Sequence, residues 1–247
     1  MSAAQPARRR PEFWSIVTVG ALATFALFLL YPLARLLVSS MTGEDGGAAM
    51  LWRTYVEFFT RKYYYETLIN SLLVSTLVTA LALAIGAPLA YFVSRYDIPG
   101  KLVVRALVVL TFVSPPFIGA YAWILLLGRN GVITGWLAAL GVKLPSIYGA
   151  NGIVLVFTLQ ALPFVFLLVS AGLRTVDQSI EDAAINLGRR PLAVALTVIA
   201  PLIAPSLATG ALLVFVTSLS DFGTPSIIGE KFRMLASQIY TEFVNEH

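Results

Sequence analysis

The chain has 247 residues, of which 58% are hydrophobic and 12% charged, and its formal net charge is +4. Soluble domains carry roughly a quarter charged residues, so this composition excludes an ordinary water-soluble globule. The same hydrophobicity excludes a disordered chain, and the lack of cysteine excludes a disulfide scaffold. We therefore expect a membrane protein.

Five long segments without any charged residue dominate the chain. They are residues 13–34, 67–94, 106–128, 144–173 and 191–220. Each is long enough to cross a membrane as a helix, which takes about 20 apolar residues. A membrane β-barrel would instead show alternating pieces of about 10 residues. The predicted fold class is all-α: a polytopic membrane protein with five spans in a single transmembrane domain, residues 1–247.

The topology follows from the basic residues that flank these segments. The first segment is too long for the core of a signal peptide, so we interpret it as a retained span. With the N-terminus in the cytoplasm, the inside segments hold nine Lys or Arg in 40 positions and the outside segments eight in 74. The positive-inside rule therefore predicts a cytoplasmic N-terminus. Because the net charge reflects topology, nucleic acid is not an expected partner.

The five segments contain no Asp, Glu, Lys, Arg or His. Proton- and voltage-driven carriers place ionisable groups within the membrane, because charge movement is their energy coupling. Energy is therefore expected from elsewhere, although sodium coupling through backbone carbonyls stays open. The Ser114-Pro115-Pro116 step predicts a helix break, which either lines a pathway or is an ordinary feature of a membrane helix. Close helix packing is expected at the small residues Gly86, Gly119, Ala120, Gly210 and Ala211.

The loop from Arg174 to Pro191 predicts a short, separately capped amphipathic helix. Ser179 and Asp182 fit a capping box at its start, and Gly188 fits a left-handed cap at its end. The apolar residues at helical spacing are Ile180, Ala183, Ala184 and Leu187. The polar residues on the other side are Glu181, Asp182 and Asn186. Such a helix either rests on lipid headgroups or docks a cytoplasmic partner.

The same loop resembles a known family. Asp182-Ala183-Ala184-Ile185-Asn186-Leu187-Gly188, then nine residues, then Val198-Ile199-Ala200-Pro201, is similar to the EAA loop of permease subunits of ABC importers. Asp182, Val198 and Ala200 replace the family's Glu, Ile and Leu. In that family the loop is a coupling helix that sits in a cleft of a cytoplasmic ATPase subunit. The resemblance thus implies these coupling residues: Glu181, Asp182, Ala183, Ala184, Gly188, Arg189 and Pro201.

Two further motifs look like the ferric-iron branch of these permeases. They run from Ser114 to Trp123 and from Ser220 to Pro225. The resemblance implies a type I importer permease bundle in the bacterial inner membrane that moves ferric iron. Relatives that take thiamine, polyamines or aminoethylphosphonate supply the alternative substrates. The candidate substrate path comprises Ser114, Pro115, Pro116, Ser218, Ser220 and Asp221. The last three contact either the solute or its binding protein, or else Asp221 merely begins an outer loop.

The resemblance also implies the assembly around this chain. ATP would be used by the separate ATPase subunits, so this chain would be no enzyme and would bind no cofactor or metal. A periplasmic or extracellular binding protein would deliver the solute, and a second permease unit would complete the pore. A family unit normally ends in a further span, so we expect a sixth span to be missing here and the chain to cover most of the first unit of a two-unit permease.

Two other function classes stay open. A secondary carrier or channel would transport without ATP. A membrane-embedded enzyme would need a polar catalytic cluster, whereas Asp177, Glu181 and Asp182 are the only carboxylates in the last inner loop and no His or Cys accompanies them.

Overall fold

The computed structural model describes residues 13–42, 55–113 and 116–245, and no strand occurs among them. The predicted all-α class is confirmed within these residues. The chain divides into two compact units, residues 1–62 and 63–247, which are described separately.

The first unit contains one long apolar helix. It comprises α1 (Phe13–Phe25), the π-helical turn η1 (Ala26–Leu30) and α2 (Tyr31–Thr42), and residues 55–60 are also helical. Its stretch Phe13–Ser40 has 28 residues, and none of its most apolar window is buried. A helix that is apolar all round needs lipid or other membrane helices about it. The first predicted span is therefore a helix of sufficient length to cross a membrane.

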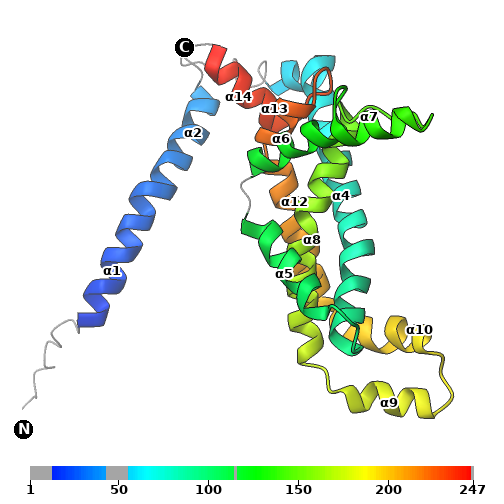
Figure 1. Ribbon diagram of the computed structural model, residues 1–247. Helices are drawn as coiled ribbons and strands as arrows, with labels where there is room; N and C mark the ends of the chain where they lie inside the picture. The colour runs from blue at the N-terminus through cyan, green and yellow to red at the C-terminus, as the bar shows by residue number, and fades with distance from the viewer. Residues whose placement is uncertain (1–12, 43–54, 114–115, 246–247) are drawn as a thin grey trace, which may run out of the picture. The chain divides into compact units, whose positions relative to one another are not determined.

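The second unit is a bundle with short helices across its two ends (Figure 1). Its longer helices are α4 (Lys62–Arg95), α5 (Lys101–Val113), α6 (Pro116–Leu127), α8 (Ala150–Arg174), α12 (Ala204–Ser220) and α14 (Leu235–Asn245). The shorter elements are α7 (Val132–Ala139), α9 (Gln178–Asn186), α10 (Pro191–Val194), the π-helical turn η2 (Ala195–Ile199), α11 (Ala200–Leu202) and α13 (Gly223–Ile228). Helices α9 and α10 lie at one end, and α13 and α14 at the other (Figure 1).

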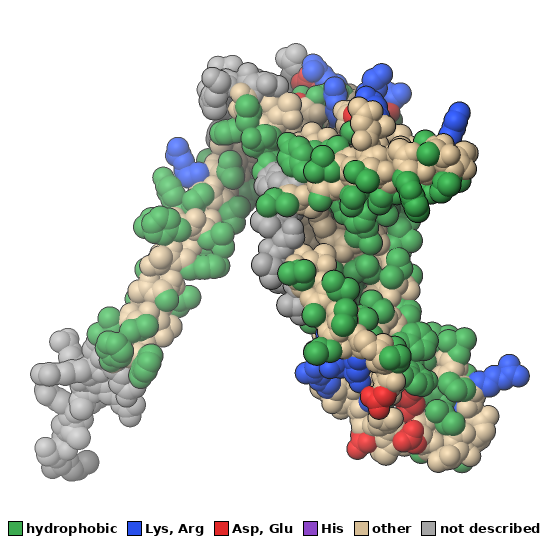
Figure 2. Space-filling view, in the orientation of Figure 1, with side chains coloured by type: hydrophobic (Ala, Val, Ile, Leu, Met, Phe, Trp, Pro, Cys, Tyr) green, Lys and Arg blue, Asp and Glu red, His purple; other side chains and the backbone are tan. Residues whose placement is uncertain are grey.

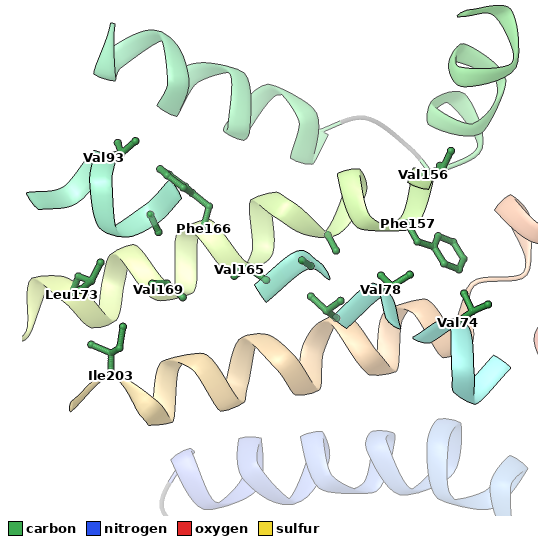
Figure 3. Packing of buried hydrophobic residues seen from close by; sticks show 14 of the residues in the cluster. Val74, Val78, Val93, Val156, Phe157, Val165, Phe166, Val169, Leu173 and Ile203 are labelled. Carbon is green, nitrogen blue, oxygen red and sulfur yellow. The ribbon is translucent and has the colours of Figure 1, made fainter. Parts of the chain in front are cut away.

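Helix α8 lies at the centre of the packing. Its side chains Val165, Val169 and Leu173 are at most 1% exposed and belong to one apolar cluster with Ile203 (Figure 3). A Cβ added to Gly86 of α4 would lie 2.9 Å from Cγ1 of Val165, so the glycine lets α4 and α8 approach closely. This contact bears out the packing interpretation of Gly86.

Two predicted spans are found as single helices, and the predicted fifth span is bent. Helix α4 has 34 residues and covers the second segment, whereas α8 has 25 residues and covers the fourth only from Ala150 onward. In the third, α5 ends at Val113 and α6 begins at Pro116, while Ser114 and Pro115 lie outside the described residues. In the fifth, Pro191–Leu202 and α12 meet at an angle of 76°. The described residues thus hold four helices long and apolar enough to span, or up to five if the bent pair counts as one.

Charge and polarity divide along the second unit. On the face seen in Figure 2, charged side chains gather at the two ends, and the surface between them is apolar. This distribution suits a bundle whose middle lies in hydrocarbon and whose ends reach water.

Candidate functional site

Helix α9 begins two residues earlier than the sequence indicates. Its N-cap is Asp177, whose carboxylate oxygen Oδ1 accepts a 2.9 Å hydrogen bond from the backbone N–H of Ser179. The capping box predicted with Ser179 as N-cap is therefore wrong, because Ser179 already lies inside the first turn. The hydrogen bonds from Ser179, and more weakly the charge of Arg95, hold the pKa of Asp177 below its usual range.

Helix α9 ends as predicted, at a glycine in the left-handed region. Gly188 has φ = +88°. Its N–H donates to the carbonyl of Ile185 at 2.8 Å, and the N–H of Arg189 donates to that of Ala184 at 3.3 Å. This pair of bonds is a Schellman motif, which satisfies the last carbonyls of the helix. Both ends of α9 are thus held by local contacts, a side-chain cap at Asp177 and a glycine cap at Gly188.

The burial of side chains on α9 differs from that expected for a simple amphipathic helix, in which apolar residues are buried and polar residues are exposed. On its apolar side, Ile180 is 43% and Leu187 86% exposed, and Ala183 is also exposed. Glu181, expected on the polar side, is buried with 5% exposure, whereas Asp182 is exposed. The physical reason is that Glu181 has a charged partner within the bundle. Helix α9 therefore presents an uncovered apolar face at the end of the molecule.

The partner of Glu181 is the last residue of α4. The Nε atom of Arg95 lies 3.2 Å from Oε2 of Glu181, and the two side chains are 9% and 6% exposed. The contact is an ion pair without the alignment of a hydrogen bond. The Tyr91 hydroxyl donates to Oε1 of Glu181, and Arg95 Nη2 donates to the carbonyl of Val176 at 3.0 Å. Removal of one member of a buried pair costs about 3–5 kcal/mol, because the other charge stays buried.

The remaining residues of the predicted loop connect α9 to the bent helix. Arg189 Nη1 donates to the Thr197 hydroxyl at 3.0 Å, which ties the end of α9 to η2. Pro201 is exposed in α11, just before the 76° bend. Ala184 is half-buried and packs against the apolar cluster. The predicted loop residues therefore gather at the α9 end of the bundle.

The predicted substrate-path residues that the structure describes lie toward the opposite end. Ser218 is buried with 5% exposure, and the Ser220 hydroxyl donates to the carbonyl of Val216 at 2.8 Å. The Asp221 carboxylate accepts from the backbone N–H groups of Gly223 at 2.7 Å and Thr224 at 3.1 Å. Asp221 thus holds the start of α13. The path itself stays a prediction, because Ser114 and Pro115 lie outside the described residues, as does the Pro116 side chain.

Comparison with known proteins identifies the family of this chain. Residues 82–245, which include α9 and the bent helix, match the family model of the binding-protein-dependent transport system inner membrane component. The chain belongs to this family. A putative ferric transport system permease protein of Haemophilus influenzae, FbpB 1, is 30% identical to this permease over 215 residues, 86% of this chain and 34% of that protein. The permease chain spans between 33% and 41% of the length of the ferric relatives it matches.

Two further relatives bear on the permease. A putative 2-aminoethylphosphonate transport system permease protein of Salmonella typhimurium, PhnU, is 26% identical over 242 residues, 96% of this chain and 83% of that protein. The crystal structure of a bacterial alginate ABC transporter, in complex with an alginate pentasaccharide-bound periplasmic protein, contains a chain with TM-score 0.73 and 16% identity. The match covers 94% of the permease and 83% of that chain, and it shows the common fold.

Sequence reasoning missed the two partners of Glu181, Arg95 and Tyr91. Arg95 directly follows a long uncharged segment, where a basic residue is most often an interfacial anchor. The one available signal was the spacing of Tyr91 and Arg95, which lie four residues apart and so share a face of α4. Their partner Glu181 is 90 residues from Tyr91, so only the folded chain reveals these contacts.

Proposed function

We propose that this chain is the permease subunit of an ATP-driven importer of the bacterial inner membrane. It lends its helices to an alternating-access cycle, while cytoplasmic ATPase subunits hydrolyse ATP. A binding protein delivers the solute at the outer face, and a second permease unit completes the pore. The chain itself carries out no reaction.

The observation that carries the proposal is the uncovered apolar face of α9. Ile180, Ala183 and Leu187 point away from the bundle, while both ends of the helix are capped. A helix this short is marginal in water without such caps and a packed face. The exposed face fits a cleft in a soluble subunit, and small Ala183 allows close approach.

The α9 end of the bundle and the N-terminus are both proposed to face the cytoplasm. The loops and helix ends on this side carry the basic residues Arg95, Lys101, Arg105, Arg174, Arg189 and Arg190. Basic residues are enriched in cytoplasmic loops, and this is also the side where a soluble ATPase has access to ATP.

A pull-down from native membranes tests the proposal. We compare tagged permease with its Gly188→Val variant, because valine at a φ of +88° strains the cap of α9. Gly100→Val is the matched control: Gly100 has φ = +83° in a loop at the same end of the bundle and nothing within 4 Å of its added Cβ. We expect an ATP-binding subunit with the unchanged permease and with Gly100→Val, and its loss with Gly188→Val. No ATPase with any of them would contradict the proposal and favour an ATP-independent carrier.

Ferric iron is the proposed solute, supported by the 30% identity to the ferric transport permease over 86% of this chain. A second candidate is 2-aminoethylphosphonate, because its permease relative matches this chain over most of both lengths. Uptake of radiolabelled ferric iron and of 2-aminoethylphosphonate into cells with and without the permease separates the two. Iron uptake that depends on the permease supports ferric iron as the solute. Permease-dependent uptake of 2-aminoethylphosphonate alone would contradict ferric iron and support the phosphonate.

The route of the solute is proposed to run past the Ser114-Pro115-Pro116 step and the start of α13. The residues on it are Ser114, Pro115, Pro116, Ser218, Ser220 and Asp221. The support is the Ser114-Pro115-Pro116 step in the sequence, because proline removes a backbone N–H and frees carbonyl groups that can line a polar path.

A further inference from the structure

We propose that Glu181, Arg95 and Tyr91 form a latch that makes α9 and α4 move as one rigid body. The latch would convert a movement of α9 into a movement of α4 along the whole bundle. This inference rests on the proposed function, since it names the residues through which the docked helix acts. These three are positioning residues, which touch neither ATP nor the solute.

The latch joins elements that the chain does not connect directly. Tyr91 and Arg95 lie four residues apart on the last turns of α4, so both side chains reach the same neighbour. That neighbour is Glu181, in the first turn of α9, whose two carboxylate oxygens contact one of them each. Arg95 also binds the carbonyl of Val176, the residue before the cap of α9. One guanidinium thus holds both the helix and the loop that leads into it.

Helix α4 extends the connection to the other end of the bundle. It stays a single helix of 34 residues, continuous through Pro88. Near its start, Asn70 Nδ2 donates to the carbonyl of Arg233 at 3.2 Å, and the Ser71 hydroxyl accepts from the backbone N–H of Leu235 at 2.7 Å. Leu235 is the first residue of α14. A displacement of α9 therefore has a continuous hydrogen-bonded route to the segment that lies on the proposed outer side.

Burial distinguishes this pair from an ordinary surface ion pair. Arg95 and Glu181 are 9% and 6% exposed, so water does not screen their attraction. Asp97 and Lys101 form a pair at 3.5 Å in the neighbouring loop, with exposures of 105% and 28%. An exposed pair of this kind contributes little and is easily replaced by solvent. Asp97→Asn is therefore a matched control at the same end of the molecule.

Transport per ATP is the first readout. The permease is reconstituted in vesicles with its ATPase and binding protein, and solute uptake and ATP hydrolysis are measured together. We expect Glu181→Gln to lower the solute moved per ATP by about tenfold with the ATPase still bound, since the buried Arg95 loses its counter-charge. The double reversal Glu181→Arg with Arg95→Glu should recover part of the ratio, and Asp97→Asn should leave it unchanged. An unchanged ratio in Glu181→Gln would overturn the proposal, since a merely structural role alters the amount of folded protein and not the ratio.

A distance measurement tests the rigid connection without any partner. The chain contains no cysteine, so spin labels can be placed at Asn186 of α9 and at exposed Ile85 of α4. We expect one narrow distance in the otherwise unchanged permease and a broadened distribution with Glu181→Gln. Equal distributions would overturn the latch even where the ATPase binds. Conversely, a narrow distance that broadens would support the latch even if no ATPase were recovered, which separates its failure from that of the proposed function.

Discussion

Ser206 of α12 lies directly against Gly172 of α8. A Cβ atom added to the glycine would stand 2.4 Å from the serine Oγ and 2.8 Å from its Cβ. Helices α8 and α12 pack against each other extensively. The absence of a side chain at Gly172 therefore sets how closely the two helices approach.

The first prediction concerns whether a substitution at Gly172 lowers or raises the stability of the permease. Gly172→Ala should lower the stability of the permease, because overpacking costs about 1–3 kcal/mol and the serine Cβ cannot rotate away. In a Ser206→Gly background the same substitution should raise stability by about 1 kcal/mol, which is the helix preference of alanine over glycine. Thermal unfolding in detergent of the four proteins measures both effects.

A control for this prediction lies on α7. Nothing lies within 4 Å of a Cβ added to Gly135, so Gly135→Ala should not destabilise the protein. If Gly172→Ala lowered stability equally in both backgrounds, the contact with Ser206 would not be its cause.

The uncharged segments predicted the lengthwise helices well. A chain in lipid must satisfy its backbone groups within each helix, so composition alone locates α4 and α8. The bend of 76° before α12 was harder to predict, although Pro201 and Pro205 flank it. Proline permits a bend at either position, and packing against neighbouring helices decides where the helix turns and by how much.

For the candidate site, local features were predictable and long-range ones were not. The glycine cap of α9 depends only on residues next to it, so Gly188 was identified from the sequence. The start was misplaced because Asp177 and Ser179 are both good N-caps two residues apart. The inward face of α9 depends on Arg95, which belongs to another helix. No periodicity within α9 carries that information.

The second prediction concerns acid and the cap of α9. The pKa of Asp177 lies below its ordinary value of 3.8, so the charged cap stabilises α9 above that pH. This contribution is lost as the pH falls through the lower pKa of the folded protein. We expect the backbone amides of the first turn to exchange faster at about pH 3 than at about pH 6, after correction for intrinsic rates. Hydrogen exchange with mass spectrometry measures this.

Two variants isolate the carboxylate of Asp177. Asp177→Asn keeps a side-chain oxygen for the N–H of Ser179, so protection should persist and lose its pH dependence. Asp177→Ala should give fast exchange at both pH values. Unchanged protection in Asp177→Ala would mean that packing, and not the cap, holds the first turn.

The third prediction concerns the exposed face of α9. Leu187 is 86% exposed, so Leu187→Ser should change the stability of the permease by less than about 0.5 kcal/mol. If the face docks an ATPase, the same variant should weaken its recovery at least about tenfold, as for an apolar anchor in an interface. Leu102→Ser is the control, because Leu102 at the start of α5 is 80% exposed. Equal loss of ATPase with both variants would move the docking surface away from α9.

The fourth prediction separates two roles of Asp221. Its carboxylate accepts from the N–H groups of Gly223 and Thr224, so the side chain has a structural task whatever the solute does. Asp221→Ala should lower stability by about 1 kcal/mol, as the loss of a helix cap does. Asp221→Asn keeps an acceptor oxygen, so stability and solute uptake should both persist. Uptake that falls in Asp221→Asn without a loss of stability would show instead that the negative charge itself acts on the transported solute. Ser226→Ala is the control, because Ser226 is exposed and lies outside the proposed route, and its hydroxyl donates to the carbonyl of Phe222 one turn back.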